Sequence, residues 1–175
     1  MTEELGFSKS RDFVRAVHGL YNMEAVRETL YNAPRVLDVR DQKYRGGPQH
    51  WNKEILYPES GIMQALESHI VYFGPYGRSA KHGHQNGAVF YILEGEGYEI
   101  HDEKRYDWRA GDVVIVHNAC VHQHFNATDR PAKALVIKSK PPFMFFHLLW
   151  QRNVEMPPKE PAPGFEEFDL PAGEI

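Results

Sequence analysis

The sequence is poor in the features that define several large classes of protein. It has one cysteine, Cys120, so it cannot form an internal disulfide, and we expect this thiol to be a buried apolar filler. The most apolar run, Phe143 to Trp150, is interrupted by His147 and is far shorter than the roughly 20 residues of a membrane-spanning helix, so we expect a buried strand or a short helix there. The net charge of -4 leaves no basic stripe for a phosphate backbone. We therefore expect a cytoplasmic protein that binds neither membranes nor nucleic acid.

The pattern of apolar residues predicts a single all-β domain with an N-terminal helical part. Residues 9–32 carry apolar side chains at spacings of three and four, which indicates one or two amphipathic helices. From residue 68 onward, short β-rich runs alternate with turn residues, which favours an antiparallel jelly-roll β-barrel. The expected parts are residues 1–66 as a helical and irregular extension, 67–150 as the barrel and 151–175 as an extended, proline-rich tail. The expected strands lie near residues 69–74, 88–94, 97–101, 105–109, 113–117, 121–126, 132–138 and 143–149.

Histidine is abundant, with ten residues in the chain. Four of these histidines form two HxH pairs, His82 with His84 and His122 with His124. In an extended strand, the side chains of residues i and i+2 point to the same face, about 7 Å apart along the chain. Two such imidazoles can therefore converge on one metal ion.

Two motifs in this region resemble those of the cupin superfamily. In that family an HxH pair precedes a glutamate and a glycine, and a second motif places a glycine before a histidine and an asparagine. The matching residues are His82, His84 and Gly95 for the first motif, and Gly111, His122 and Asn126 for the second. The resemblance covers about residues 70–140. It implies a jelly-roll β-barrel in which His82, His84 and His122 are the metal ligands.

One position departs informatively from the family pattern. Ala88 stands where the family places a metal-binding glutamate, and an alanine cannot bind a metal. Three neutral imidazoles leave the charge of a divalent ion uncompensated, so an anionic chelating substrate and dioxygen can complete its coordination. The three-histidine pattern is similar to that of gentisate-type ring-cleaving dioxygenases. This similarity implies an Fe(II)-dependent dioxygenase that cleaves a C–C bond of a phenolic or dicarbonyl substrate with O2, in the catabolism of aromatic compounds.

Several residues are candidates for roles around the metal. His124 shares a strand face with His122, so it can bind a substrate oxygen or act as an acid or base, with a structural role as the alternative. The guanidinium of Arg78 is a candidate for holding a substrate carboxylate, with a solvated loop position as the alternative. Gln85 and Asn86 could bring an amide oxygen to the ion. We expect a structural or surface role for the histidines His18, His50, His69, His101 and His147. Gly95 and Gly97 flank Glu96 after a buried strand, where we expect both glycines to support a positive backbone φ.

Two further functions fit the same residues. A cupin with Mn, Ni or Zn in place of iron can be a lyase or isomerase that uses the metal as a Lewis acid. A cupin barrel can also bind a small molecule without catalysis. The sequence contains no recognisable DNA-binding or signalling segment, which favours an enzyme. In each case we expect a small-molecule partner, and a homodimer or higher homo-oligomer that covers exposed strand edges.

Overall fold

The computed structural model describes residues 24–57 and 65–170, which contain two short helices and eleven strands. In chain order these elements are α3 (Glu24–Asn32), β1 (Arg45–Gly46), β2 (His50–Leu56), β3 (Glu67–Phe73), β4 (Lys81–His84), β5 (Ala88–Glu94), β6 (Glu96–His101), β7 (Lys104–Arg109), β8 (Val113–Val116), β9 (Val121–Asn126), β10 (Ala132–Lys138), α4 (Lys140–Phe145) and β11 (Gln151–Glu155).

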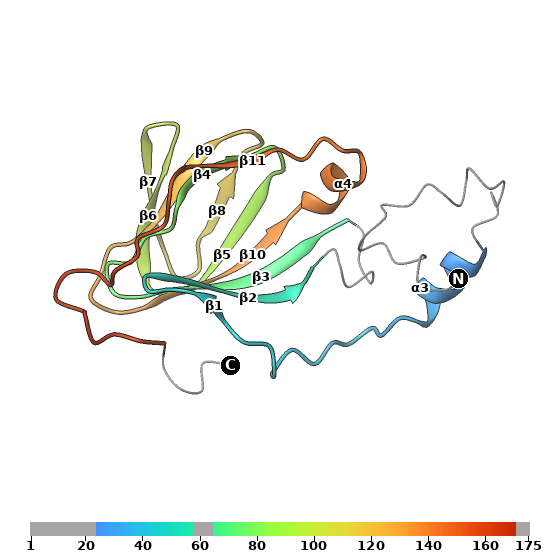
Figure 1. The fold of residues 1–175 in the computed structure, drawn as a ribbon, viewed down its shortest axis with the longest axis horizontal. Helices are drawn as coiled ribbons and strands as arrows, with labels where there is room; N and C mark the ends of the chain where they lie inside the picture. Colours follow the sequence, from blue (N-terminus) through green and yellow to red (C-terminus); the bar gives the residue numbers. More distant parts are fainter. Residues whose placement is uncertain (1–23, 58–64, 171–175) are drawn as a thin grey trace.

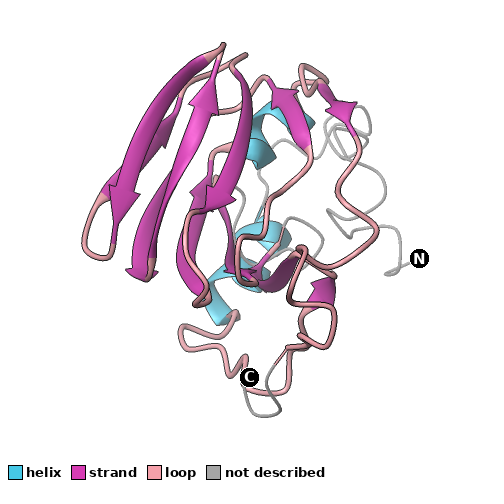
Figure 2. Cartoon of the chain, turned by 90° about the vertical axis from the view of Figure 1, so that its left-hand side faces the viewer, coloured by secondary structure: helices cyan, strands magenta, loops and turns pink. Residues whose placement is uncertain are grey.

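The strands form two antiparallel sheets that face each other (Figures 1 and 2). The first sheet has the order β1-β2-β3-β10-β5-β8, and the second has the order β11-β4-β9-β6-β7. Neighbouring strands in each sheet are mostly distant in sequence, as in β3 with β10 and β4 with β9. This is the all-β jelly-roll architecture that the sequence predicts.

The hydrophobic core lies between the sheets, and the first sheet supplies most of it. Because side chains alternate along a strand, residues two apart share a face. On β5 the inward residues are Ala88, Phe90 and Ile92, and on β10 the buried apolar residues are Ala132, Ala134 and Val136. The inner face of the second sheet instead carries histidines and a glutamate. A polar cluster therefore lies beside an apolar wall.

The prediction of a strand near residues 143–149 is wrong. The structure places α4 there, and the next strand, β11, begins only at Gln151. Pro141 and Pro142 occupy the first helical positions, where the missing N–H of proline costs no hydrogen bond. An apolar run by itself does not distinguish a short helix from a strand.

Three strands outside residues 67–150 join the sheets, namely β1, β2 and β11. β2 pairs with β3 along most of its length, and β11 pairs with β4, with Gln151 opposite His84 and Asn153 opposite His82. The division of the chain into three parts stays a prediction. These strands nevertheless show that segments on both sides of the expected barrel complete its sheets.

The N-terminal helix prediction is tested only in part. α3 lies within the predicted range, whereas residues 9–23 lie outside the described residues. In Figure 1, α3 lies apart from the sheets, and the side chain of Tyr31 is 79% exposed. Among the described residues, no helix combines the length and the apolarity that crossing a membrane requires.

Part of the outer surface is apolar. On β5 and on the edge strand β8, Val89, Tyr91, Leu93, Val113 and Ile115 are exposed. A contiguous apolar face of this kind is typical of surfaces that associate. The homo-oligomer expected from the sequence stays a prediction, and this face is where we would place its contact.

The two glycines around Glu96 serve different purposes. Gly95 has a φ of +84°, as expected, but Gly97 has no positive φ, so that expectation is wrong for Gly97. A Cβ atom on Gly97 would lie 2.1 Å from the carbonyl oxygen of Phe125 and 2.5 Å from the ring of Trp108. Gly97 is therefore required by the close approach of β9 and of the Trp108 side chain on β7.

We expect Gly97→Ala to destabilise the fold strongly. The added methyl group would collide with a backbone oxygen and a buried ring, so the free energy of unfolding should fall by about 3 kcal/mol, or roughly 6–12 °C in Tm. Thermal unfolding followed by circular dichroism measures this. Gly87→Ala is the control. The atom nearest to its new Cβ would be Asn118 Oδ1 at 3.1 Å, and this side-chain atom can move aside more easily than a backbone oxygen. Equal Tm values for the two variants would contradict the close-approach explanation.

Candidate metal centre

Three histidines from two neighbouring strands converge between the sheets. β4 carries His82 and His84, and the register of β4 with β9 places His82 directly opposite His122. One ring nitrogen from each of these histidines can be chosen so that the three atoms lie within 4.8 Å of one another. His84 and His122 are buried and His82 is half-buried. The three residues predicted as ligands are thus brought together in a group that could hold a metal ion, and their role as ligands stays a prediction.

The main chain holds each of the three rings in the same tautomer. In each ring the Nδ1 atom contacts a backbone carbonyl oxygen. The distance is 3.1 Å from His82 Nδ1 to the oxygen of Ala80, 2.7 Å from His84 Nδ1 to the oxygen of Asn86, and 3.1 Å from His122 Nδ1 to the oxygen of Cys120. A carbonyl oxygen only accepts hydrogen bonds, so Nδ1 must carry the proton in each ring. The Nε2 atoms therefore keep their lone pairs, which is the form in which imidazole binds a metal.

Burial favours the neutral form of these rings. It lowers the pKa of His82 to about 4, with a smaller contribution from the positive charge that His124 carries when it is protonated. Burial is also the main cause of the lowered pKa values of His84 and His122. Three neutral donors can bind a cation without first losing a proton.

His124 lies beside this cluster and is held by a buried glutamate. Glu99 on β6 is 1% exposed and is the cross-strand partner of His124. Its Oε1 atom accepts a hydrogen bond from His124 Nδ1 at 2.8 Å, and its Oε2 atom lies 2.5 Å from His101 Nε2. Burial by itself raises the pKa of Glu99, but the charge of His124 and the hydrogen bonds from both histidines outweigh it and lower the pKa to about 2.

Glu99 and its contact with His101 are the parts of the site that sequence reasoning missed. A signal was present, because Glu99 and His101 are two residues apart and so share one face of a predicted strand. Nothing in the local sequence, however, shows that Glu99 lies opposite His124. The ionised carboxylate accepts from Nδ1 of His124, which leaves Nε2 of that ring available to another group.

The other predicted residues are placed less centrally. Arg78 is exposed, and its backbone N–H donates to Gln49, so its predicted role in binding substrate stays a prediction without support from its position. Asn86 is buried, and its backbone oxygen accepts from His84, while its Oδ1 atom has no partner within the described residues. Gln85 is half-buried, and its N–H donates to the carbonyl of Trp150.

Cys120 is a buried residue of the core, as expected. Burial, reinforced by the nearby Asp102, raises the pKa of its thiol to about 11. The thiol therefore stays protonated near neutral pH and does not act as a thiolate ligand or nucleophile. Its carbonyl oxygen, which orients His122, is the group that serves the site.

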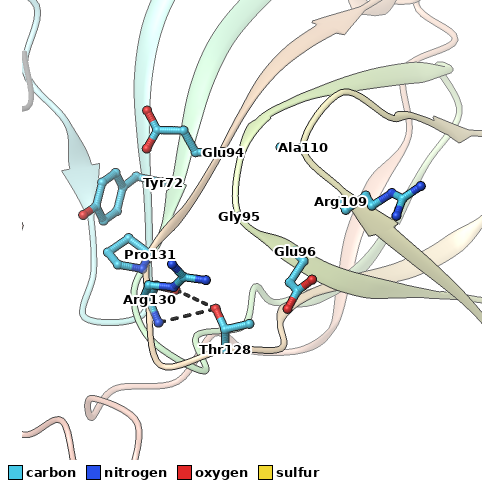
Figure 3. A pocket seen from close by; sticks show the side chains of 9 residues that line it. All are labelled: Tyr72, Glu94, Gly95, Glu96, Arg109, Ala110, Thr128, Arg130 and Pro131. Atoms are coloured by element: carbon cyan, nitrogen blue, oxygen red, sulfur yellow. Dashed lines mark hydrogen bonds between the residues drawn. The ribbon is translucent and has the colours of Figure 1, made fainter.

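A separate pocket of about 600 Å³ lies at the turn between β5 and β6 (Figure 3). Its lining contains Arg109 and Arg130 together with Glu94 and Glu96, so its charges balance. Its lining contains no histidine, and the hydrogen bonds drawn in Figure 3 join the Thr128 hydroxyl to the backbone of Arg130. We assign it no function.

Comparison with known proteins shows similarity centred on the barrel. Residues 69–138 match the family model of the cupin domain. The chain is 35% identical over 63 residues to a gentisate 1,2-dioxygenase from a Streptomyces species, covering 35% of this chain and 18% of that protein. It is 30% identical over 93 residues to an uncharacterized protein of Methanocaldococcus jannaschii, covering 52% of this chain and 73% of that protein.

A solved structure shows the same fold. Salicylate 1,2-dioxygenase from Pseudoaminobacter salicylatoxidans, determined with gentisate, superposes with a TM-score of 0.56 at 12% sequence identity. The superposition covers 82% of this chain and 36% of that chain. The chain thus spans less than a fifth of the gentisate dioxygenase and little more than a third of the salicylate dioxygenase.

Proposed function

The chain belongs to the cupin superfamily, and from that premise we propose that it is a metal-dependent dioxygenase. In this proposal His82, His84 and His122 bind Fe(II), and the substrate is a small phenolic or dicarbonyl compound that chelates the metal and loses a C–C bond to O2. The observation that carries the proposal is the set of three imidazoles, two buried and one half-buried, whose Nδ1 atoms are all engaged by carbonyl oxygens. Their free Nε2 lone pairs form the donor set that a divalent transition metal prefers.

The composition of the cluster supports iron and oxygen chemistry. Among the described residues, the cluster contains no aspartate or glutamate, and the buried carboxylate of Glu99 is already engaged by two histidines. Bound by neutral ligands alone, Fe(II) would retain its full charge and supply both Lewis acidity and electrons for O2. The chain itself contributes the orientation of the three rings and the apolar wall of the first sheet.

The side chain of His124 is suited to handle a proton of the substrate. Its ring centroid lies 5.1 Å from that of His122 and 4.4 Å from that of Phe90, so it is packed against both the cluster and the apolar wall. In its neutral form, the ring of His124 donates its Nδ1–H to Glu99 and presents the lone pair of Nε2. That atom can accept the proton of a hydroxyl group as the substrate binds.

Anaerobic reconstitution followed by oxygen uptake tests the proposal. We expect the protein loaded with Fe(II) to consume O2 with at least one chelating phenolic acid or diketone, at roughly 1 s⁻¹ or faster. The same protein loaded with Zn is the control, because Zn has no redox chemistry. Turnover that continues in argon with Mn, Ni or Zn would establish the lyase or isomerase instead, and no uptake with any chelating compound would refute the dioxygenase.

A further inference from the structure

A charged cluster with a buried carboxylate lies at the end of the barrel where β3 begins and β10 ends. Glu67 is 5% exposed, and its two carboxylate oxygens face two ammonium groups, Lys138 Nζ at 3.7 Å and Lys140 Nζ at 3.4 Å. The register places Lys138 between Glu67 on β3 and Ala88 on β5. One carboxylate is therefore shared by two cations.

The side chain of Lys138 belongs to the inner face of its sheet. Ala134 and Val136 on β10 are core residues, and Lys138 continues the same alternation. Its neighbours across the two adjoining strands, Glu67 and Ala88, are also buried. The ammonium group thus lies on the side of the sheet that faces the histidines.

The acid–base properties of His69 agree with this position. The pKa of His69 is lowered to about 2, mainly by burial and next by the positive charge of Lys138. The ammonium of Lys138 therefore lies within electrostatic range of His69.

His69 provides an independent sign that a ligand group belongs here. It is 5% exposed, and its Nδ1 atom has no hydrogen-bond partner within residues 24–57 and 65–170. A buried polar atom without a partner costs about 1–3 kcal/mol, so such atoms in proteins usually meet a water or a ligand. His69 lies two residues from Glu67 on the same strand face, beside Lys138.

A pocket connects this cluster with the surface. Its volume is about 430 Å³, and both Glu67 and Lys140 contribute to its lining. Lys43 and Arg45 add two cations to the lining, and Glu54 adds one carboxylate. With Lys138 behind Glu67, positive charge exceeds negative charge along this approach, which attracts anions.

We propose that Lys138 and His69 form a subsite for the carboxylate of the small molecule that the barrel binds, so that its substrates are organic acids. This assignment rests on the proposed function, because the rest of the ligand would lie at the histidine cluster. When the ligand is absent, Lys138 is held by Glu67. When the ligand binds, its carboxylate accepts hydrogen bonds from Lys138 and His69, and Glu67 keeps Lys140 as its partner.

Calorimetric titration with benzoate and with its neutral counterpart benzamide tests the subsite. The protein is used as purified, and its metal content is measured on the same sample. We expect wild-type protein to bind benzoate at least about tenfold more tightly than benzamide, because charge-assisted hydrogen bonds are the stronger kind. Lys138→Met should weaken benzoate binding by a similar factor. Glu67→Gln should strengthen it several-fold, because it removes the carboxylate that competes for Lys138.

Lys133→Met is the matched control, since Lys133 lies on the same strand but its ammonium is 5.7 Å from the centre of the Tyr72 ring. Benzoate binding that is unchanged in Lys138→Met, or benzamide binding as tight as benzoate, would overturn the subsite. The opposite signs expected for Lys138→Met and Glu67→Gln separate a direct effect from general damage to the fold. A protein that binds benzoate through Lys138 but contains no transition metal would refute the dioxygenase while leaving the subsite intact.

Discussion

Replacing His122 with alanine is expected to remove metal binding almost completely while the barrel stays folded. The ring of His122 stands at the centre of the cluster, with ring centroids 4.3 Å from His82 and 4.8 Å from His84. Two imidazoles without a carboxylate hold an ion poorly, so we expect affinity to fall by more than the roughly 10–100-fold that loss of an outer-shell partner costs. Metal analysis after anaerobic loading and dialysis measures the loss, and circular dichroism reports the fold.

His117→Ala is the control for this experiment. His117 lies in the loop before β9 and is exposed, so removal of its ring should leave the metal content unchanged. A His122→Ala protein that keeps one equivalent of metal would show that the ion is held elsewhere. Loss of metal from both variants would indicate adventitious binding to surface histidines.

Replacing Glu99 with glutamine is expected to lower kcat by about 100-fold or more, the lower end of what a positioned acid or base contributes. Glutamine has the size of glutamate, but its amide can face His124 with NH2, which stabilises the tautomer with the proton on Nε2. That proton would occupy the atom proposed to receive the substrate proton. Because Glu99 is not a member of the histidine cluster, metal content should be unchanged and KM should change less than kcat.

The tautomer of His124 provides a readout that does not depend on turnover. Long-range ¹H–¹⁵N spectra should show Nδ1 protonated in the wild type and a shifted or mixed form in Glu99→Gln. Glu96→Gln is the matched control, since Glu96 lies on the same strand and is exposed. A wild-type kcat in Glu99→Gln would contradict the positioning role, even if that variant were less stable.

The parts of the fold that the sequence predicts are short β-rich runs bounded by turn residues. β5 and β10 are examples, because both are largely apolar and both are followed or preceded by glycine, proline or aspartate. β2 was not expected, since its sequence HWNKEIL is largely polar and buries Lys53. The apolar run from Phe143 to Trp150 fits a buried strand or a short helix, and the strand predicted there is wrong because an apolar run alone does not separate the two.

The same distinction applies to the site. The convergence of His82 and His84 follows from strand geometry alone, and His122 follows from the resemblance to cupins. The contacts of Glu99 with His124 and of Lys138 with Glu67 depend on which strands pair and in what register. Register is set by packing across the whole domain, so no local pattern shows that these residues meet.

The pairing of β11 with β4 determines how much of the chain is needed to move the histidine cluster into another protein. The strand that bears His82 and His84 has β9 along one edge and residues 151–155 along the other. The match to the cupin-domain family model ends at residue 138, before that second neighbour. A protein truncated at residue 138 would leave β4, the strand with the HxH pair, as an exposed edge strand. Such an edge can twist or pair with a strand of another chain. Any excised or grafted unit must therefore extend through Glu155.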